Sequence, residues 1–202
     1  MRLNHHRREV GLKVVYYGPG LSGKTTNLAH LHRVYPSEQR GDLVKLDTET
    51  ERTLFFDYFP VALSSIGGFR VRIDFFTVPG QSFYRATRQA VLDGVDGIVF
   101  VADSSAARED ANLLSREDMV NSLAKKGLAL GDIPHVYQWN KRDLPDAVSP
   151  GVLERLLNPE KAPSFTAVAS AGVGVWETQE ALVRQVLLAL RARPKGLEVA
   201  GG

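Results

Sequence analysis

Residues 18–25 read Gly-Pro-Gly-Leu-Ser-Gly-Lys-Thr, a complete match to the pattern G-x-x-x-x-G-K-[ST]. The apolar run 12–17 before it predicts a buried strand, and the stretch 26–31 after it is compatible with a helix. A strand, a glycine-rich turn and a helix in this order favour a phosphate-binding loop over a turn with an incidental Lys-Thr pair. The backbone N–H groups of such a loop, together with the helix N-terminus, surround a polyphosphate.

The side chains at the end of this loop have separate expected roles. Lys24 should reach the β- and γ-phosphates, where it also serves catalysis, and the Thr25 hydroxyl should bind Mg²⁺. The residues of this segment that we expect to contact the nucleotide are Gly18, Pro19, Gly20, Leu21, Ser22, Gly23, Lys24, Thr25 and Thr26.

Apolar runs and helical stretches alternate along the rest of the chain. Strands are predicted at 53–60, 69–78, 97–103, 135–140 and 166–169, and helices at 83–92, 108–123, 151–157 and 176–193. The first two of these strands should pair antiparallel across the turn at Gly67-Gly68. The next two are apolar almost throughout, as in parallel strands covered on both faces. The pattern predicts a single α/β domain with a mostly parallel sheet, one antiparallel edge strand and helices on both faces.

We expect this domain to span residues 10–193, between a flexible N-terminus (1–9) and a disordered tail (194–202). The apolar stripe of the last helix should face the core, although a membrane-surface face is the alternative reading; it comprises Leu182, Val183, Val186, Leu187 and Leu190.

Composition excludes several classes of site and anchor. The chain has no cysteine, which excludes disulfides, thiolate metal sites, a cysteine nucleophile, prenylation and palmitoylation. Arg2 after Met1 excludes N-myristoylation. The net charge of +2 is too small to indicate a nucleic-acid-binding surface, and no apolar run is long enough to span a bilayer. We therefore expect a cytoplasmic protein without a lipid anchor.

The stretch Asn140-Lys141-Arg142-Asp143 distinguishes GTP from ATP. It ends a predicted parallel strand, where the Asp143 carboxylate can accept hydrogen bonds from guanine N1–H and the 2-amino group, two donors that adenine does not present in that geometry. Asn140 can bond the N7 edge and tether the strands, and the Lys141 stem can lie over the base. A surface turn is the alternative reading of this stretch.

The stretch Thr77-Val78-Pro79-Gly80-Gln81 ends the predicted strand 69–78. In a guanine-nucleotide switch this point faces the γ-phosphate, so the Gly80 N–H can bond a γ-phosphate oxygen and Gln81 can orient the attacking water. An ordinary Pro-Gly turn is the alternative.

A polar stretch before the strand 53–60 ends in Arg52-Thr53. Thr53 is the natural sensor of Mg²⁺ and the γ-phosphate, although Thr48 and Thr50 compete for this role. Arg52 can supply positive charge to the transition state from within the chain. Alternatively, Arg52 is solvated and pairs with a neighbouring glutamate.

Together these residues resemble the Ras-like small GTPases, and more closely the MglA-type GTPases of bacterial gliding motility and polarity. The resemblance covers about residues 10–192 and is carried by segments 14–28, 51–57, 77–81, 94–104 and 140–146. It implies a GTP/GDP switch in which Arg52 and Gln81 are the arginine finger and catalytic glutamine, and Thr53 contacts Mg²⁺.

The chain departs from the broader Ras-like pattern at two places. Thr77 stands where that pattern has an aspartate that holds a Mg²⁺-bound water, and Asp57 on the paired strand could reach the same water. The loop that backs the guanine falls on Val168-Ala169-Ser170, where only the Ala169 N–H toward the guanine oxygen is retained and the usual lysine is absent.

The expected function is a molecular switch that hydrolyses GTP slowly alone. By resemblance, a homodimeric roadblock-fold activating protein orders Arg52 and Gln81, the output is polarity or surface motility, and partners recruit the protein to a cell pole. The exchange factor and effectors are not identifiable from the sequence. A nucleotide-dependent binding module without turnover is one alternative, against which Arg52 and Gln81 argue. A P-loop ATPase or kinase is another, against which the 140–143 stretch argues.

Overall fold

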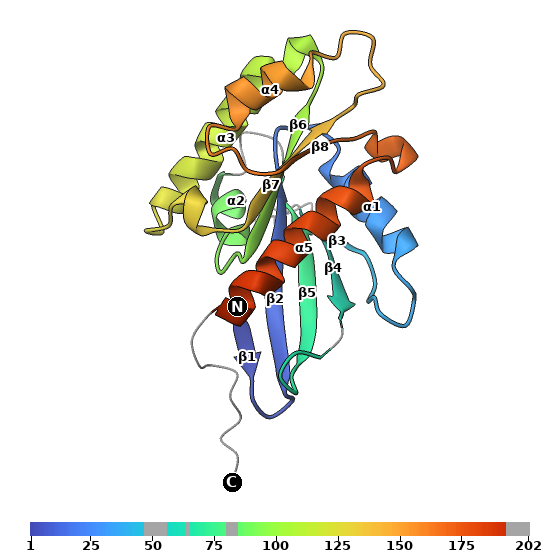
Figure 1. The fold of residues 1–202 in the computed structure, drawn as a ribbon, viewed down its shortest axis with the longest axis vertical. Helices are drawn as coiled ribbons and strands as arrows, with labels where there is room; N and C mark the ends of the chain where they lie inside the picture. Colours follow the sequence, from blue (N-terminus) through green and yellow to red (C-terminus); the bar gives the residue numbers. More distant parts are fainter. Residues whose placement is uncertain (47–55, 64, 80–84, 193–202) are drawn as a thin grey trace.

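A mixed eight-stranded sheet organises the fold, which a computed structural model describes for residues 1–46, 56–63, 65–79 and 85–192. Along the sheet the order is β3-β4-β5-β2-β6-β7-β8, and β1 pairs with β2 outside this path (Figure 1). The strands are β1 (Arg2–Asn4), β2 (Glu9–Tyr17), β3 (Val44–Leu46), β4 (Phe56–Ala62), β5 (Arg70–Thr77), β6 (Gly97–Asp103), β7 (His135–Asn140) and β8 (Ser164–Thr166).

The central strands β5, β2, β6, β7 and β8 run parallel, whereas β4 is antiparallel to both β3 and β5. This arrangement confirms the predicted α/β class with its mostly parallel sheet. The predicted antiparallel strand is β4, but β3, which the sequence did not predict, pairs outside it and forms the edge. β1 is also antiparallel, to β2. β3 has three residues, too few for an alternating pattern to stand out.

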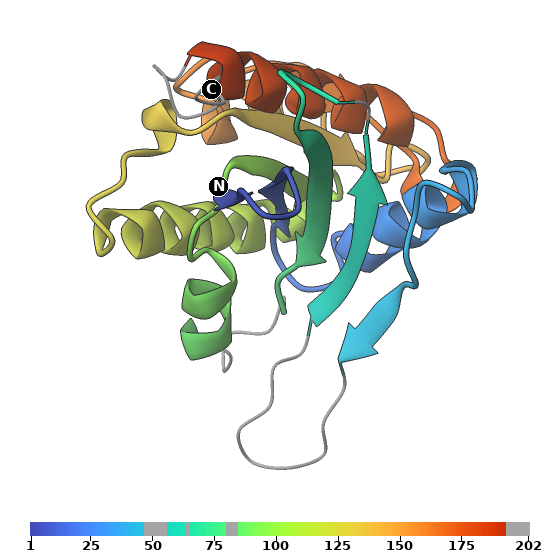
Figure 2. The same cartoon turned by 90° about the horizontal axis from the view of Figure 1, so that it is seen from below.

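Helices flank the sheet on both faces (Figure 2). They are α1 (Lys24–Val34), α2 (Arg85–Val91), α3 (Glu109–Ala124), α4 (Pro150–Leu157) and α5 (Val175–Ala192), with short 3₁₀ turns η2 (Ala106–Arg108), η3 (Leu130–Asp132) and η4 (Ala169–Ala171). One apolar cluster joins α1 and α5 to the sheet, and a second joins α2, α3 and α4 to its other face.

The α5 stripe is buried in the first of these clusters. Leu182, Val186 and Leu190 are each at most 2 % exposed. The helix lies so close to β6 that a Cβ added at Gly97 would approach Val186 Cγ2 to 2.6 Å. The core-facing interpretation of the stripe is therefore confirmed. Within the described parts of the chain, none of the helices has the length and apolar character needed to cross a membrane.

Both ends of the predicted pattern differ in detail from the structure. At the N-terminus, where we expected a flexible segment, β1 pairs with the start of β2 and the Met1 ammonium lies 2.8 Å from a carboxylate oxygen of buried Asp96. The last strand is β8 at Ser164–Thr166, not 166–169, because residues 169–171 turn into η4. The tail 194–202 lies outside the described residues.

Candidate nucleotide-binding site

The phosphate loop joins β2 to α1 in a conformation that its glycines permit. Gly18 and Gly23 have φ values of +144° and +99°. A Cβ at Gly18 would lie 2.2 Å from the Val101 carbonyl oxygen, and one at Gly23 would lie 2.2 Å from Asn140 Nδ2. The loop therefore needs glycine at these two positions both for its backbone conformation and for space.

Lys24 is buried beneath the loop and turns back on it. Its Nζ donates hydrogen bonds to the carbonyl oxygens of Gly18 at 2.9 Å and Pro19 at 2.6 Å. Burial, followed by the nearby Arg88 charge, lowers the pKa of Lys24 to about 7, although Asp57 acts in the opposite direction. A bound phosphate would replace these carbonyl partners with a full negative charge and raise the pKa again.

Three side chains meet at the predicted metal position. The Thr25 hydroxyl donates to Asp57 Oδ2 at 2.6 Å, and the Thr77 hydroxyl donates to the same oxygen at 3.1 Å. The Asp57 N–H in turn donates to Thr77 Oγ1 at 2.8 Å. Antiparallel pairing of β4 with β5 places Asp57 across from Thr77. A carboxylate on the neighbouring strand therefore contacts both Thr25 and Thr77.

The other nearby carboxylate, Asp74, is engaged elsewhere. It accepts hydrogen bonds from the Tyr58 hydroxyl at 3.1 Å and from Arg72 Nη2 at 3.1 Å. Asp57, not Asp74, therefore lies at Thr25. A threonine hydroxyl with one carboxylate suits Mg²⁺, which takes few protein ligands beside phosphate and water oxygens.

On the base side, Asn140 links two other segments. Its Nδ2 donates to the Ser22 carbonyl oxygen at 2.7 Å, and its Oδ1 accepts the Ala169 N–H at 2.9 Å. Asn140 is 2 % exposed, so neither bond competes with much solvent. We expected the Ala169 N–H to face the guanine oxygen; in this structure it is directed to Asn140. The Asp143 side chain is exposed at the same end of the sheet.

The loop that carries Ala169 is held by tight packing. The backbones of Val168 and Val173 bridge, which brings Gly172 and Gly174 close to other elements. A Cβ at Gly172 would lie 2.0 Å from His30 Cε1 on α1, and one at Gly174 would lie 2.1 Å from the Thr166 carbonyl oxygen. Both glycines have positive φ, so the predicted spacing of this loop depends on them.

The chain is 49% identical, over 189 residues, to the "Mutual gliding-motility protein MglA" of Myxococcus xanthus (strain DK1622). The alignment covers 94% of this chain and 97% of that protein. This chain belongs to the MglA family. The resemblance derived from the sequence motifs is thereby confirmed. A comparison with protein-family models gives no match.

Four of the predicted site residues of this MglA-family chain, namely Arg52, Thr53, Gly80 and Gln81, lie outside the described residues, as do the competing Thr48 and Thr50. The strands that adjoin the two segments outside the described residues, β4 after 47–55 and β5 before 80–84, both lie close to the phosphate loop. Asp57, near the start of β4, receives the Thr25 hydroxyl, and the Val78 N–H after β5 donates to the Tyr16 carbonyl oxygen at 3.2 Å.

Sequence reasoning missed a buried polar network that joins the nucleotide loops of this MglA-family member. Asn27 on α1 and Gln138 on β7 exchange two amide hydrogen bonds, of 2.9 and 3.0 Å. Gln138 also donates to the Thr178 hydroxyl on α5 at 3.1 Å, and Thr178 donates to the Gly174 carbonyl. All three side chains are fully buried. Their spacing along the chain carries no periodic signal.

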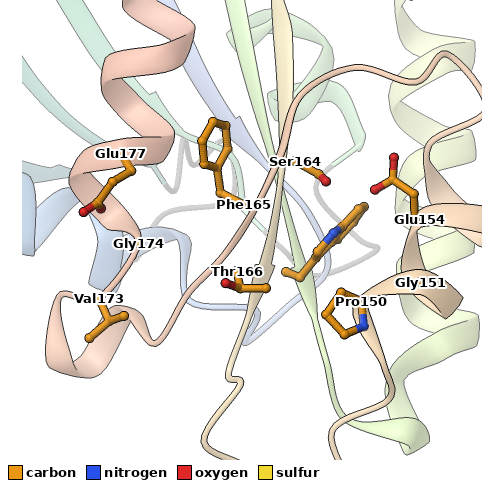
Figure 3. Close-up of a pocket in the computed structure, with 10 residues that line it drawn as sticks. Pro150, Gly151, Glu154, Ser164, Phe165, Thr166, Val173, Gly174 and Glu177 are labelled. Carbon is orange, nitrogen blue, oxygen red and sulfur yellow. The ribbon is translucent and has the colours of Figure 1, made fainter.

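A groove of about 690 Å³ lies beside the base-side loop, between α4, β8 and the start of α5 (Figure 3). Its walls carry Glu154 on one side and Glu177 on the other, and Trp139 also lines it. None of the predicted nucleotide-binding residues lines it. In this member of the MglA family the groove is separate from the phosphate loop.

Proposed function

We propose that this chain is a Mg²⁺-dependent GTP-binding and GTP-hydrolysing switch. The observation that carries the proposal is the double link made by Asn140, which joins the phosphate loop at Ser22 to the base-side loop at Ala169. Three motifs that are far apart in the sequence meet through one side chain, at the carboxyl ends of parallel strands where α/β folds bind ligands. The exposed Asp143 carboxylate gives this site its preference for guanine.

The residues present suit a magnesium nucleotide. Gly18 and Gly23 let the loop backbone pack against Val101 and Asn140, where a Cβ would clash, and the Ser22 hydroxyl is buried without a partner among the described residues. Mg²⁺ would be held by Thr25 and Thr53, with Asp57 acting through a water. When bound, the ion neutralises charge that develops on the β- and γ-phosphate oxygens.

In the hydrolysis step, Gln81 orients the attacking water and Arg52 stabilises the charge on the γ-phosphate oxygens. The Gly80 N–H and the Thr53 hydroxyl sense the γ-phosphate, and their segments relax after hydrolysis. An activating partner, proposed as a homodimeric roadblock-fold protein, accelerates the step. Membership of the MglA family supports a role in gliding motility. We also propose, from the resemblance of the sequence motifs alone, a role in polarity and a cytoplasmic protein that partners recruit to a cell pole.

Purified protein tests the proposal in two stages. Fluorescent GDP bound to the protein is first challenged with GTP, GDP or ATP; we expect GTP and GDP to displace it and ATP to fail. Displacement by ATP as effective as by GTP would reject guanine specificity. Single-turnover hydrolysis is then followed with and without a co-purifying partner. GTP binding with no turnover in either condition would favour the binding-module alternative.

A further inference from the structure

Arg108, which no sequence motif singled out, reaches the phosphate loop from η2. Its Nη2 donates a hydrogen bond to the Gly20 carbonyl oxygen at 2.7 Å. The side chain is 35% exposed, so the guanidinium lies at the outer wall of the loop and not beneath it. A charged donor on a carbonyl makes one of the stronger hydrogen bonds in proteins.

The Gly20 carbonyl belongs to the peptide unit that continues into Leu21. In a trans peptide the C=O and N–H point in opposite directions, so holding the Gly20 oxygen on Arg108 directs the Leu21 N–H away from it. None of the backbone hydrogen bonds among the described residues uses the Leu21 N–H, whereas the next N–H, of Ser22, closes a turn on Pro19. The Leu21 N–H is therefore left for a ligand.

The backbone at the Gly20–Leu21 peptide is strained. Leu21 has φ of +66°, in the left-handed region that side-chain-bearing residues seldom occupy. Its side chain is 86% exposed, so packing does not impose the conformation. The Arg108 hydrogen bond is a contact that can offset the strain.

A buried carboxylate lies near the Arg108 guanidinium. Asp103, 2% exposed in its side chain, lies 3.8 Å from Arg108 Nε and accepts a 2.7 Å hydrogen bond from Lys141 Nζ. Asn112 holds the Asp103 backbone through hydrogen bonds of 2.9 and 2.8 Å. One fixed carboxylate thus serves both the base-motif lysine and the arginine that contacts the phosphate loop.

We infer that Arg108 is a positioning residue for the nucleotide diphosphate: it holds the Gly20–Leu21 peptide so that the Leu21 N–H donates to the β-phosphate, and this slows nucleotide release. The inference rests on the proposed GTP-binding function. Arg108 acts through the loop backbone and touches no reacting atom.

The test compares Arg108→Gln with Arg116→Gln, a control that removes an arginine from the next helix, α3, where it bonds Glu160 and Tyr137. Dissociation of fluorescent GDP is followed after addition of excess GDP in the presence of Mg²⁺. Loss of one charge-assisted hydrogen bond should speed release about tenfold or more in Arg108→Gln. Arg116→Gln should stay within about twofold of the parent rate, and Arg108→Lys should recover part of the loss.

A second readout separates positioning of the diphosphate from a general structural role. Competition by GDP and by GMP, which lacks a β-phosphate, is measured for the parent and both Arg108 variants. We expect weaker binding of GDP and unchanged binding of GMP. An equal loss for both ligands, or GDP release at the parent rate, would overturn the inference. Failure of the parent protein to retain GDP would instead reject the proposed function, so the two failures are distinguishable.

Discussion

The base side and the phosphate side of the site are built differently. On the base side, Asn140 already donates to Ser22 and accepts from Ala169, and both bonds are buried. On the phosphate side, Lys24 bonds the carbonyls of its own loop and Thr25 bonds Asp57. The hydrogen bonds on the base side join parts of the protein framework. The hydrogen bonds on the phosphate side engage the side chains that would bind phosphate and Mg²⁺ in the proposed complex.

Because of this difference, we expect the two sides to contribute differently to nucleotide binding. The hydrogen bonds of Asn140 preorganise the base side, so we expect base selectivity to depend on the position of one carboxylate, Asp143, and not on rearrangement. The phosphate side must exchange internal hydrogen bonds for ligand bonds, and its lysine is held at a lowered pKa by burial. Affinity on that side should therefore respond to pH and to metal. Four experiments test this difference between the two sides.

The largest effect should come from the two residues that we propose to be catalytic. Arg52→Ala and Gln81→Ala should each reduce partner-stimulated hydrolysis by about 10³-fold or more, because a positioned arginine is worth roughly 10³–10⁵ in phosphoryl transfer. GDP affinity should stay within a few-fold, because the base side is untouched. Single-turnover hydrolysis measures the first quantity and fluorescence titration the second.

The activating partner supplies the control for that prediction. If the arginine comes from this chain, replacing every exposed arginine of the activator should leave stimulation intact. Stimulation that disappears with such an activator, yet survives Arg52→Ala, would show that the partner provides the cation.

On the base side, Asp143→Asn should weaken GTP binding about 100-fold. The amide offers a donor where guanine also presents donors, so two charge-assisted hydrogen bonds are lost. Xanthosine triphosphate, which presents an acceptor there, should become the better ligand. Asp146→Asn, an exposed neighbour in the same turn, is the matched control and should keep the parent preference. An unchanged preference for GTP in Asp143→Asn would place base recognition elsewhere.

Metal dependence tests the proposal that Asp57 takes the role of the aspartate that the Ras-like pattern has at position 77. Asp57→Ala should raise the Mg²⁺ concentration needed for tight GDP binding about tenfold, since it removes the charge next to Thr25. Thr77→Ala should do much less, because it leaves that carboxylate in place. Superimposable Mg²⁺ titrations of the parent and Asp57→Ala would contradict this assignment.

The smallest effect is a pH dependence of diphosphate affinity. With a pKa of about 7, Lys24 is charged at pH 6 and mostly neutral at pH 8 in the ligand-free protein. The bound phosphate favours the charged form, so binding takes up a proton above pH 7 and affinity should fall about fivefold between pH 7 and pH 8. Below pH 6 this contribution is constant.

Lys24→Arg provides the control for the pH experiment, because arginine remains charged throughout this range. Its overall affinity will differ, but its slope between pH 7 and pH 8 should be flat. Calorimetry in two buffers of different ionisation enthalpy would count the proton directly. Equal slopes for the parent and Lys24→Arg would show that Lys24 is already charged in the ligand-free protein.

The sequence alone was enough to predict the features that depend on a short run of neighbouring residues. The phosphate loop, the buried strands 97–103 and 135–140 and the base motif at 140–143 were all predictable. Each is a short pattern whose spacing is dictated by backbone geometry or by burial on both faces. The short strands β1 and β3 were missed because three residues carry too little periodicity, and their pairing depends on the partner strand.

Tertiary structure alone decided which side chains meet. The bonds from Thr25 to Asp57, from Arg108 to Gly20 and from Asn140 to Ser22 join residues 32, 88 and 118 positions apart. Strand register brings Asp57 to Thr25 and Thr77, whereas Asp74 on the next strand is bonded to Arg72. Side-chain chemistry states what a residue can bind, but only the packing of strands and helices brings two such residues within hydrogen-bonding distance.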